Sequence, residues 1–270
     1  MWALRYLKEK HPDIYRGLKF FASWLESDAS FCLPKQIAGG LVWTRPGLLS
    51  ASPPESHVIQ WIQRSLSPGK TLFDVGAHYG WMSIAAAKCV GAHGIVVAFE
   101  PSPILLDVLE YHRQVNQLRQ IQIVPAAVSN TDDPALDFYL INNGLSSRNS
   151  LTIGPDETPY INPEDKLQID VPGVTLDSFV ELSSIVPDVM KIDVEGAELL
   201  VLEGGRRVLE SHHPVLILGV HPYWLPQTHS VEQLFVLLEE LDYKVVDQCI
   251  LHFDSSYLAD YLCTYRGTDP

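Results

Sequence analysis

Two neighbouring stretches of the sequence bring together glycines and acids that could bind a nucleoside. Asp74 ends an apolar run and is followed by Gly76 and Gly80, and Glu100 ends the next apolar run, twenty residues past Gly80. A glycine turn between a strand and a helix presents backbone N–H groups and the positive end of a helix dipole to a ligand. An acid ending the next strand is where a ribose-binding carboxylate sits in nucleotide-binding folds. The predicted ligand-binding residues of the turn are Asp74, Gly76, Ala77, His78 and Gly80.

The nature of the ligand follows from the charges around it. Ligands of open parallel sheets bind beyond the carboxyl ends of the strands, which places Asp74, Glu100 with Pro101, Ala126–Ala127 and Asp193 around one crevice. These carboxylates would repel the pyrophosphate of a dinucleotide, and the turn lacks the GxGxxG pattern. S-adenosylmethionine carries a sulfonium and an ammonium against one carboxylate. We therefore predict S-adenosylmethionine as the cofactor, in preference to NAD.

A second dense stretch, DVMKIDVEGAELLVLEGG at residues 188–205, could carry catalysis. Alternate residues of a strand share a face, so Lys191, Asp193 and, if the extension persists, Glu195 point the same way. A lysine within a buried strand must be paired, and Asp193 or another acid is the expected partner. Glu195 and Glu198 are equally well interpreted as functional groups or as acids at the start of the next helix.

Transfer of a methyl group to a hydroxyl benefits from a group that takes the proton. His221 ends the predicted strand 214–220 and is the best base by residue type, although a capping or core histidine before Pro222 explains it equally well. Asp193 is the alternative base, or could hold a divalent cation with Glu195. Acid pairs of this spacing are also routine helix caps, so we assign no metal ligand and leave a divalent cation open. The predicted catalytic residues are Lys191, Asp193, Glu195 and His221.

The elements that position these residues alternate between strand and helix. This alternation predicts an α/β fold with a mostly parallel sheet and helices on both faces. The polar stretch Asn142–Lys166 is long for a loop and is the candidate substrate-side insertion. The predicted strands are 40–43, 71–75, 94–100, 120–124, 137–141, 167–171, 174–176, 188–193, 214–220, 243–246 and 261–265. The predicted helices are 57–66, 81–89, 103–116, 197–210 and 231–241.

The N-terminal part of the chain has a different character. After Pro12, apolar residues recur at helical spacing from Ile14 to Leu25, and residues 28–55 are rich in Gly, Ser and Pro. We predict an N-terminal helical arm and connector over residues 1–54 and the main domain over 55–270. The apolar stripe of the arm is interpreted as docking on the main domain or on a sister subunit, which leaves a homo-oligomer open. Membrane contact through the arm is the less favoured alternative.

Composition narrows the function further. The net charge of the 270 residues is −14, and residues 51–270 have 12 Lys and Arg against 29 Asp and Glu, so no nucleic-acid partner is expected. The four cysteines lie far apart without CxxC pairs, which is typical of reduced thiols. The sequence has no run of eighteen apolar residues, and we do not expect residues 1–10 to be a signal peptide, because Glu9 and Lys10 interrupt the apolar core. We therefore expect a cytoplasmic protein.

Six ordered blocks resemble the FkbM-type S-adenosylmethionine-dependent methyltransferases over roughly residues 55–222: FDVGAHYG, VVAFEPSP, AAVSN, VTLDSF, DVMKIDVEGAELLVLEGG and PVLILGVHP. The resemblance implies the class I methyltransferase (Rossmann-like) fold with seven strands. It also implies O-methylation of a hydroxyl on a small molecule, such as a sugar, a glycosylated or polyketide natural product or a lipid-linked compound.

The resemblance also implies a role for each matched residue. Asp74, Gly76 and Gly80 form the donor turn, Glu100 holds the ribose diol, 125–128 borders the adenine, and Asp193 and Glu195 face the transfer site. The chain departs from the family pattern at His78, where an Asn is usual, and at Gly219, where an acid is usual. The departure at Gly219 keeps open an alternative function, a non-catalytic nucleoside-binding scaffold domain. An NAD-dependent oxidoreductase is the third hypothesis, disfavoured by the missing GxGxxG pattern.

Overall fold

The computed structural model describes residues 32–37, 40–45, 48, 55–141, 144, 146, 149–152, 166–226, 228–253 and 256–268. The helix predicted in the N-terminal arm and most of the stretch 142–166 lie outside these residues.

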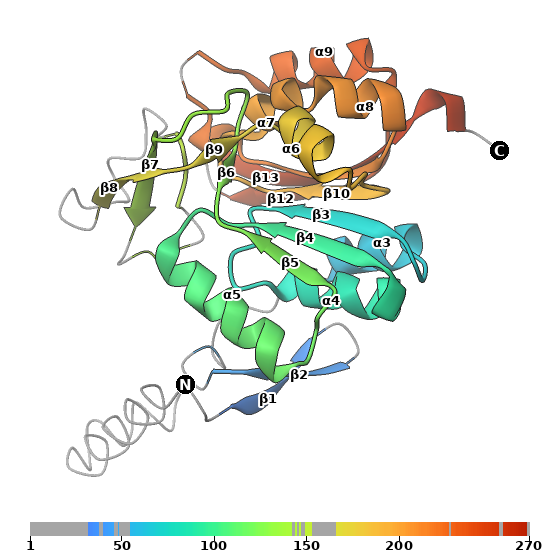
Figure 1. The fold of residues 1–270 in the computed structure, drawn as a ribbon. Helices are drawn as coiled ribbons and strands as arrows, with labels where there is room; N and C mark the ends of the chain where they lie inside the picture. Colours follow the sequence, from blue (N-terminus) through green and yellow to red (C-terminus); the bar gives the residue numbers. More distant parts are fainter. Residues whose placement is uncertain are drawn as a thin grey trace.

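A seven-stranded sheet forms the middle layer of the protein (Figure 1). Its strand order is β5-β4-β3-β10-β11-β13-β12, and only β13 runs antiparallel to its neighbours, so the predicted mostly parallel seven-stranded sheet is confirmed. Chain order reverses between β3 and β10, which puts the switch point beside the glycine turn. The strands are β3 (Thr71–Val75), β4 (Ile95–Phe99), β5 (Ile121–Val124), β10 (Val189–Ile192), β11 (Val215–Val220), β12 (Tyr243–Phe253) and β13 (Ser256–Tyr265).

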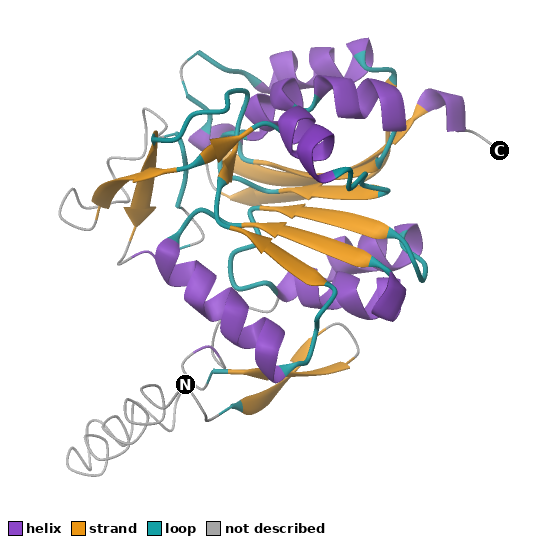
Figure 2. Cartoon of the chain, viewed as in Figure 1, coloured by secondary structure: helices purple, strands orange, loops and turns teal. Residues whose placement is uncertain are grey.

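Helices cover both faces of this sheet (Figure 2). Successive strand residues point to opposite faces, so Leu72 packs under one helical layer and Phe73 under the other, and both are fully buried. One layer consists of α3 (Ser56–Ser65), α4 (Trp81–Val90) and α5 (Pro103–Val115). The other consists of α6 (Leu176–Ser183), α7 (Glu198–Gly204), α8 (Arg206–His212) and α9 (Val231–Glu240). Short 3₁₀ helices are η2 (Gly91–His93), η5 (Pro222–Trp224) and η6 (Arg266–Thr268).

Three small strand pairs lie outside the central sheet (Figure 1). They are the hairpin β1 (Leu33–Ile37) with β2 (Gly40–Thr44), the pair β6 (Ala127–Val128) with β9 (Gly173–Val174), and the pair β7 (Leu136–Ile141) with β8 (Lys166–Val171). The hairpin β1–β2 docks on α5, because the side chain of Asn116 exchanges two 2.9 Å hydrogen bonds with the backbone of Trp43. The connector therefore contacts the main domain, while a domain boundary at residue 55 stays a prediction.

Several predicted elements were wrong in type or length. The single helix predicted over 197–210 is two helices, α7 and α8, which meet at Gly205. A Cβ on Gly204 would lie 2.0 Å from the backbone oxygen of Ser129, so only glycine permits this close approach. Leu176 begins α6 and does not continue a strand, because the Thr175 hydroxyl caps the helix by accepting the N–H of Ser178. The closing strand β12 is nearly three times as long as predicted, and β13 is twice as long.

Candidate functional site

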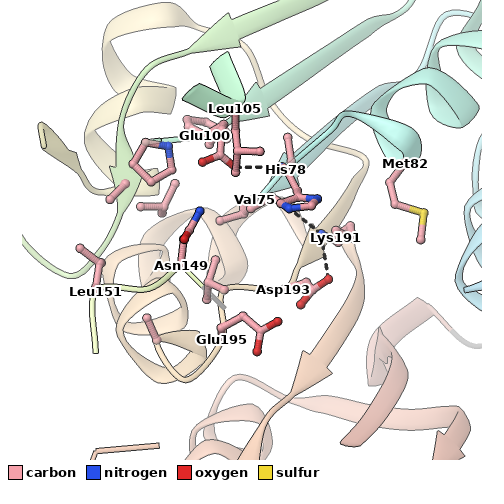
Figure 3. A pocket seen from close by; sticks show the side chains of 18 of the residues that line it. Val75, His78, Met82, Glu100, Leu105, Asn149, Leu151, Lys191, Asp193 and Glu195 are labelled. Carbon is pink, nitrogen blue, oxygen red and sulfur yellow. Dashed lines mark hydrogen bonds and ion pairs between the residues drawn. The ribbon is translucent and has the colours of Figure 1, made fainter. Parts of the chain in front are cut away.

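A cavity of about 610 Å³ opens beyond the carboxyl ends of β3, β4 and β10. This size is typical of a small-molecule site. Of the predicted site residues, those that line it are Gly76, Ala77, His78, Glu100, Pro101, Ala126, Ala127, Lys191, Asp193 and Glu195. Asp74, Gly80 and His221 do not line it. Figure 3 shows Glu100 at one side of the cavity and Asp193 and Glu195 at the other, with His78 between them.

The glycine turn is held by hydrogen bonds within the protein. The N–H groups of Gly76 and Ala77 both donate to the carbonyl of Phe99, at 3.1 and 3.0 Å, and that of Gly80 donates to the Ala77 carbonyl at 2.7 Å. The N–H of His78 donates to Glu100 Oε2 at 2.8 Å. Each of these four N–H groups therefore already has an acceptor within the protein, and ligand binding by the turn residues stays a prediction.

Asp74 is positioned beneath the turn. Its side chain is fully buried, Oδ2 accepts the hydroxyl proton of Ser83 at 2.5 Å, and Oδ1 lies 3.4 Å from Lys191 Nζ. Lys191 also donates to the Gly76 carbonyl at 2.9 Å and lies 3.2 Å from Asp193 Oδ2, so the predicted pairing of this lysine is confirmed. Burial opposes its charge, but Asp193 and Asp74 together hold the pKa of Lys191 above its ordinary value. Lys191 thus links the floor of the turn to the cavity wall.

Glu100 faces the turn from the end of β4. Its side chain is buried, with Oε1 accepting the N–H of Ser102 at 2.8 Å while Oε2 accepts that of His78. Burial raises the pKa of Glu100 to about 7, although the two backbone N–H groups favour the charged form. The carboxylate is fixed at the cavity wall and retains lone pairs that can accept hydrogen bonds from a diol.

A buried histidine that was not singled out from the sequence holds the glycine turn in place. His112 lies in α5, is fully buried, and its Nδ1 donates to the Tyr79 carbonyl at 2.7 Å. Nε2 lies 2.9 Å from the Thr44 hydroxyl, and the ring stacks on Trp81 at 4.7 Å. His112 therefore ties the hairpin β1–β2 and α5 to the turn. Only its position on the apolar face of α5 could have indicated burial.

We expect His112 to make folding sensitive to acid. Burial lowers the pKa of His112 to about 4, whereas an unfolded histidine titrates near about 6.5. The unfolded chain therefore binds a proton that the folded chain excludes, and stability present above pH ~6.5 is lost as the pH falls toward ~4. The loss is about 3 kcal/mol. Urea unfolding at several pH values should show this loss of stability in the wild type and not in His112→Gln. The same pH dependence of the free energy of unfolding in both proteins would contradict the burial of a neutral His112.

At the other side of the cavity, Asp193 and Glu195 lie beside the imidazole of His221, which does not itself line the cavity. His221 Nε2 lies 3.5 Å from Asp193 Oδ1 and 3.7 Å from Glu195 Oε2, and His221 Nδ1 lies 2.7 Å from Glu198 Oε1. Burial opposes protonation, but Glu195, Glu198 and Asp193 hold the pKa of His221 well above its ordinary value. Burial likewise opposes ionisation of Asp193, and Lys191 and His221 outweigh it, so the pKa of Asp193 lies below its usual range.

The backbone around Glu195 differs from the extended strand that was assumed. β10 ends at Ile192, and Glu195 and Gly196 have positive φ angles of 53° and 100°. The Ser150 hydroxyl donates to the Glu195 carbonyl at 2.7 Å and fixes this left-handed turn. Glu195 is not the cap of α7, whose N-cap is Ala197, and Glu198 turns back to accept the Gly196 N–H at 3.1 Å. Glu195 thus reaches His221 through a turn, with its carboxylate near that of Asp193 (Figure 3).

Some cavity residues were not singled out from the sequence. Glu55 lines the cavity from the start of α3, and Ser146, Asn149 and Leu151 line it from the stretch 142–166. Figure 3 shows Asn149 and Leu151 at the cavity wall. The role of this stretch as a substrate-side insertion stays a prediction.

Comparison with known families decides what kind of protein this is. Residues 74–245, well over half of the chain, match the Methyltransferase FkbM domain. The chain belongs to the FkbM methyltransferase family. This confirms the resemblance seen in the six sequence blocks, and with it a methyltransferase that uses S-adenosylmethionine. The match begins at Asp74 and contains the glycine turn, Glu100 and the Asp193–His221 cluster. No curated protein matches the sequence.

Solved structures that resemble this FkbM-family protein are distant in sequence. Precorrin-6y C5,15-methyltransferase from Geobacter metallireducens is 13% identical, with a TM-score of 0.46 over 80% of this chain and 93% of that one. TYW2 from M. jannaschii, solved with AdoMet, is 14% identical, with a TM-score of 0.48 over 87% and 86%. Trm5b from Pyrococcus abyssi is 12% identical, with a TM-score of 0.49 over 85% and 54%.

Some of these structures, by their titles, belong to tRNA methyltransferases. Likenesses at this distance do not decide the acceptor, so the absence of a nucleic-acid partner stays a prediction. Among the helices that the structure describes, none is both long and apolar enough to cross a membrane.

Proposed function

We propose that this FkbM-family enzyme transfers the methyl group of S-adenosylmethionine to a hydroxyl oxygen of a small molecule, such as a sugar, a natural product or a lipid-linked compound. The observation that carries the proposal is that Asp193 and Glu195 line the cavity on the opposite side from Glu100 (Figure 3), with His221 3.5 Å from Asp193. One side of the cavity offers an acceptor for a ribose diol. The other offers groups that hold a hydroxyl and take its proton.

In the proposed reaction the acceptor oxygen attacks the methyl carbon in line with the departing sulfur. The O–C bond forms as the C–S bond breaks, the electron pair of that bond goes to sulfur, and S-adenosylhomocysteine leaves. Alignment of these three atoms supplies much of the rate. The hydroxyl proton passes to the Asp193 carboxylate, whose Oδ1 lies 3.5 Å from His221 Nε2. Lys191, 3.2 Å from Asp193 Oδ2, fixes the carboxylate from behind and acts as a positioning residue.

The small-molecule acceptor is favoured by charge and by shape. Residues 51–270 have a large excess of acids, which disfavours a polyphosphate partner. The acceptor side of the cavity holds Glu55, Asp193 and Glu195 and is suited to a polar, hydroxyl-rich molecule. Assays with a panel of sugars, polyketide alcohols and tRNA, using radiolabelled donor, test this choice. Label in tRNA and in none of the small molecules would contradict it.

A non-catalytic scaffold that binds the donor is the rival function. Gly219 lies beside Asp193 without a side chain, where a Cβ would be 3.4 Å from Asp193 Oδ1. If a carboxylate at this position were essential for turnover, the chain would bind donor and transfer nothing. Calorimetric binding of S-adenosylmethionine, followed by S-adenosylhomocysteine release with the acceptor panel, separates the two functions.

We expect the donor affinity to depend on Glu100. Glu100→Ala should weaken S-adenosylmethionine binding by roughly 10- to 150-fold, the value of hydrogen bonds to a charged group. Because the pKa of Glu100 is about 7, wild-type affinity should rise with pH through this value as the carboxylate ionises. Calorimetry at pH 6 and 8 measures both effects. Glu110→Ala, on the exposed side of α5, is the control, and equal affinity of the two variants would contradict the ribose placement.

A further inference from the structure

One ring nitrogen of His221 lies between two carboxylates without a hydrogen bond to either. Nδ1 of His221 is engaged by Glu198, at 2.7 Å. Nε2 makes no hydrogen bond within the described part of the chain, and the side chain is 10% exposed. It points between two carboxylate oxygens, 3.5 Å away on Asp193 and 3.7 Å away on Glu195. These separations are too long for hydrogen bonds and suit three atoms that share one cation.

We propose that Asp193, Glu195 and His221 bind a divalent metal ion of the Mn²⁺ type. One ligand atom from each residue lies within 4.8 Å of the others, the geometry of three ligands around one ion. Two carboxylates with one imidazole form a mixed set that suits Mn²⁺ better than a soft metal. The ligands come from the end of β10 and the end of β11, so a rigid part of the sheet positions them.

The surroundings orient each ligand toward this point. Glu198 is fully buried and holds His221 through Nδ1, the arrangement in which a carboxylate fixes the ring of a metal-binding histidine. Lys191 forms an ion pair with Asp193 Oδ2, at 3.2 Å, and Asp193 Oδ1 lies on the side of His221. The Ser150 hydroxyl fixes the backbone of Glu195. The side chains of His221 and Asp193 and the backbone of Glu195 are thus held by separate contacts.

The local charge also favours a cation. Asp74, Asp193, Glu195 and Glu198 supply four carboxylates, against Lys191, which pairs with two of them, and His221, which lies beside three of them. A divalent ion would offset the remaining excess of negative charge at the cavity wall that Asp193 and Glu195 line. With three protein ligands, the ion keeps open positions for water or a hydroxyl of the acceptor. The site itself does not depend on the proposed acceptor, and only its use in catalysis rests on the proposed function.

Binding of Mn²⁺ to the full chain without donor tests the proposal directly. Calorimetry and electron paramagnetic resonance should show one bound ion per chain, with a nitrogen coupling from the imidazole. Asp193→Asn and His221→Ala should abolish saturable binding, and the nitrogen coupling should disappear in His221→Ala. Glu198→Gln should weaken binding by roughly 10- to 100-fold, the usual effect of an outer partner. Glu195→Gln is the conservative variant that keeps the proposal testable if His221→Ala fails to fold.

A matched histidine provides the control. His57 Nε2 lies 2.7 Å from Asp260 Oδ2, a single histidine–carboxylate pair, and His57→Ala should leave Mn²⁺ affinity unchanged. The proposal would be overturned by absence of saturable Mn²⁺ binding to the wild type, or by binding that the Asp193 and His221 variants retain. Calorimetry with S-adenosylmethionine on the same preparations is independent, because a chain that binds Mn²⁺ but no donor contradicts only the proposed function.

Discussion

Lys191→Met is expected to destabilise the protein by about 3–5 kcal/mol, among the largest effects of a single substitution in this chain. The methionine fills the space of the lysine stem but removes the charge that faces Asp74, 3.4 Å away. Asp74 is fully buried and would keep only the Ser83 hydroxyl as a partner. A buried carboxylate without a counter-charge costs far more than an exposed one, because burial removes its hydration.

A double-mutant cycle and an exposed ion pair make this prediction specific. Asp74→Asn combined with Lys191→Met should recover most of the lost stability, because the amide still accepts the Ser83 hydroxyl and carries no charge. Lys70→Met breaks the 2.6 Å pair with Asp188, whose side chains are 49% and 35% exposed, and should cost less than about 1 kcal/mol. Urea denaturation of Lys191→Met, Asp74→Asn, their combination and Lys70→Met measures these differences. Similar losses for Lys70→Met and Lys191→Met would show that burial of the pair is unimportant.

The sequence predicted those features of the fold and site that depend on local pattern. Apolar runs ending in Asp74 and Glu100 placed two strands of the sheet, because the ends of parallel strands meet at one edge. The same rule placed Asp193 by the cavity. The interpretation of His221 as a strand-end residue near this edge also agrees with the structure, where β11 ends at Val220.

The features that the sequence left undecided depend on contacts between distant segments. His112 clamps the glycine turn because the hairpin β1–β2 brings Thr44 to it across 68 residues, which no local periodicity encodes. Glu198 could be a helix acid or a functional acid until the structure placed it against His221, 23 residues away. Glu195 reaches the same histidine through a left-handed turn, a backbone conformation that sequence pattern rarely predicts outside glycine.

The second large effect concerns the first glycine of the turn. Gly76 has a φ angle of +79°, and a Cβ added there would lie 2.0 Å from the backbone oxygen of Asp193. The turn would therefore have to move away from β10, breaking the 3.1 Å hydrogen bond from Gly76 to Phe99 and the 2.9 Å bond from Lys191 to the Gly76 carbonyl. Gly76→Ala should destabilise the protein by more than about 4 kcal/mol. Any folded fraction should bind S-adenosylmethionine weakly.

Gly69 separates the two causes of this effect. Its φ angle is +86°, and no atom lies within 4 Å of a Cβ built there, so Gly69→Ala carries the backbone strain without the clash. This variant should lose about 1–2 kcal/mol, the cost of a left-handed conformation for alanine. Thermal unfolding and donor calorimetry of both variants, at one protein concentration, measure the difference. Equal losses in the two variants would mean that strain alone requires glycine at position 76, and that the close approach of the turn to Asp193 contributes nothing.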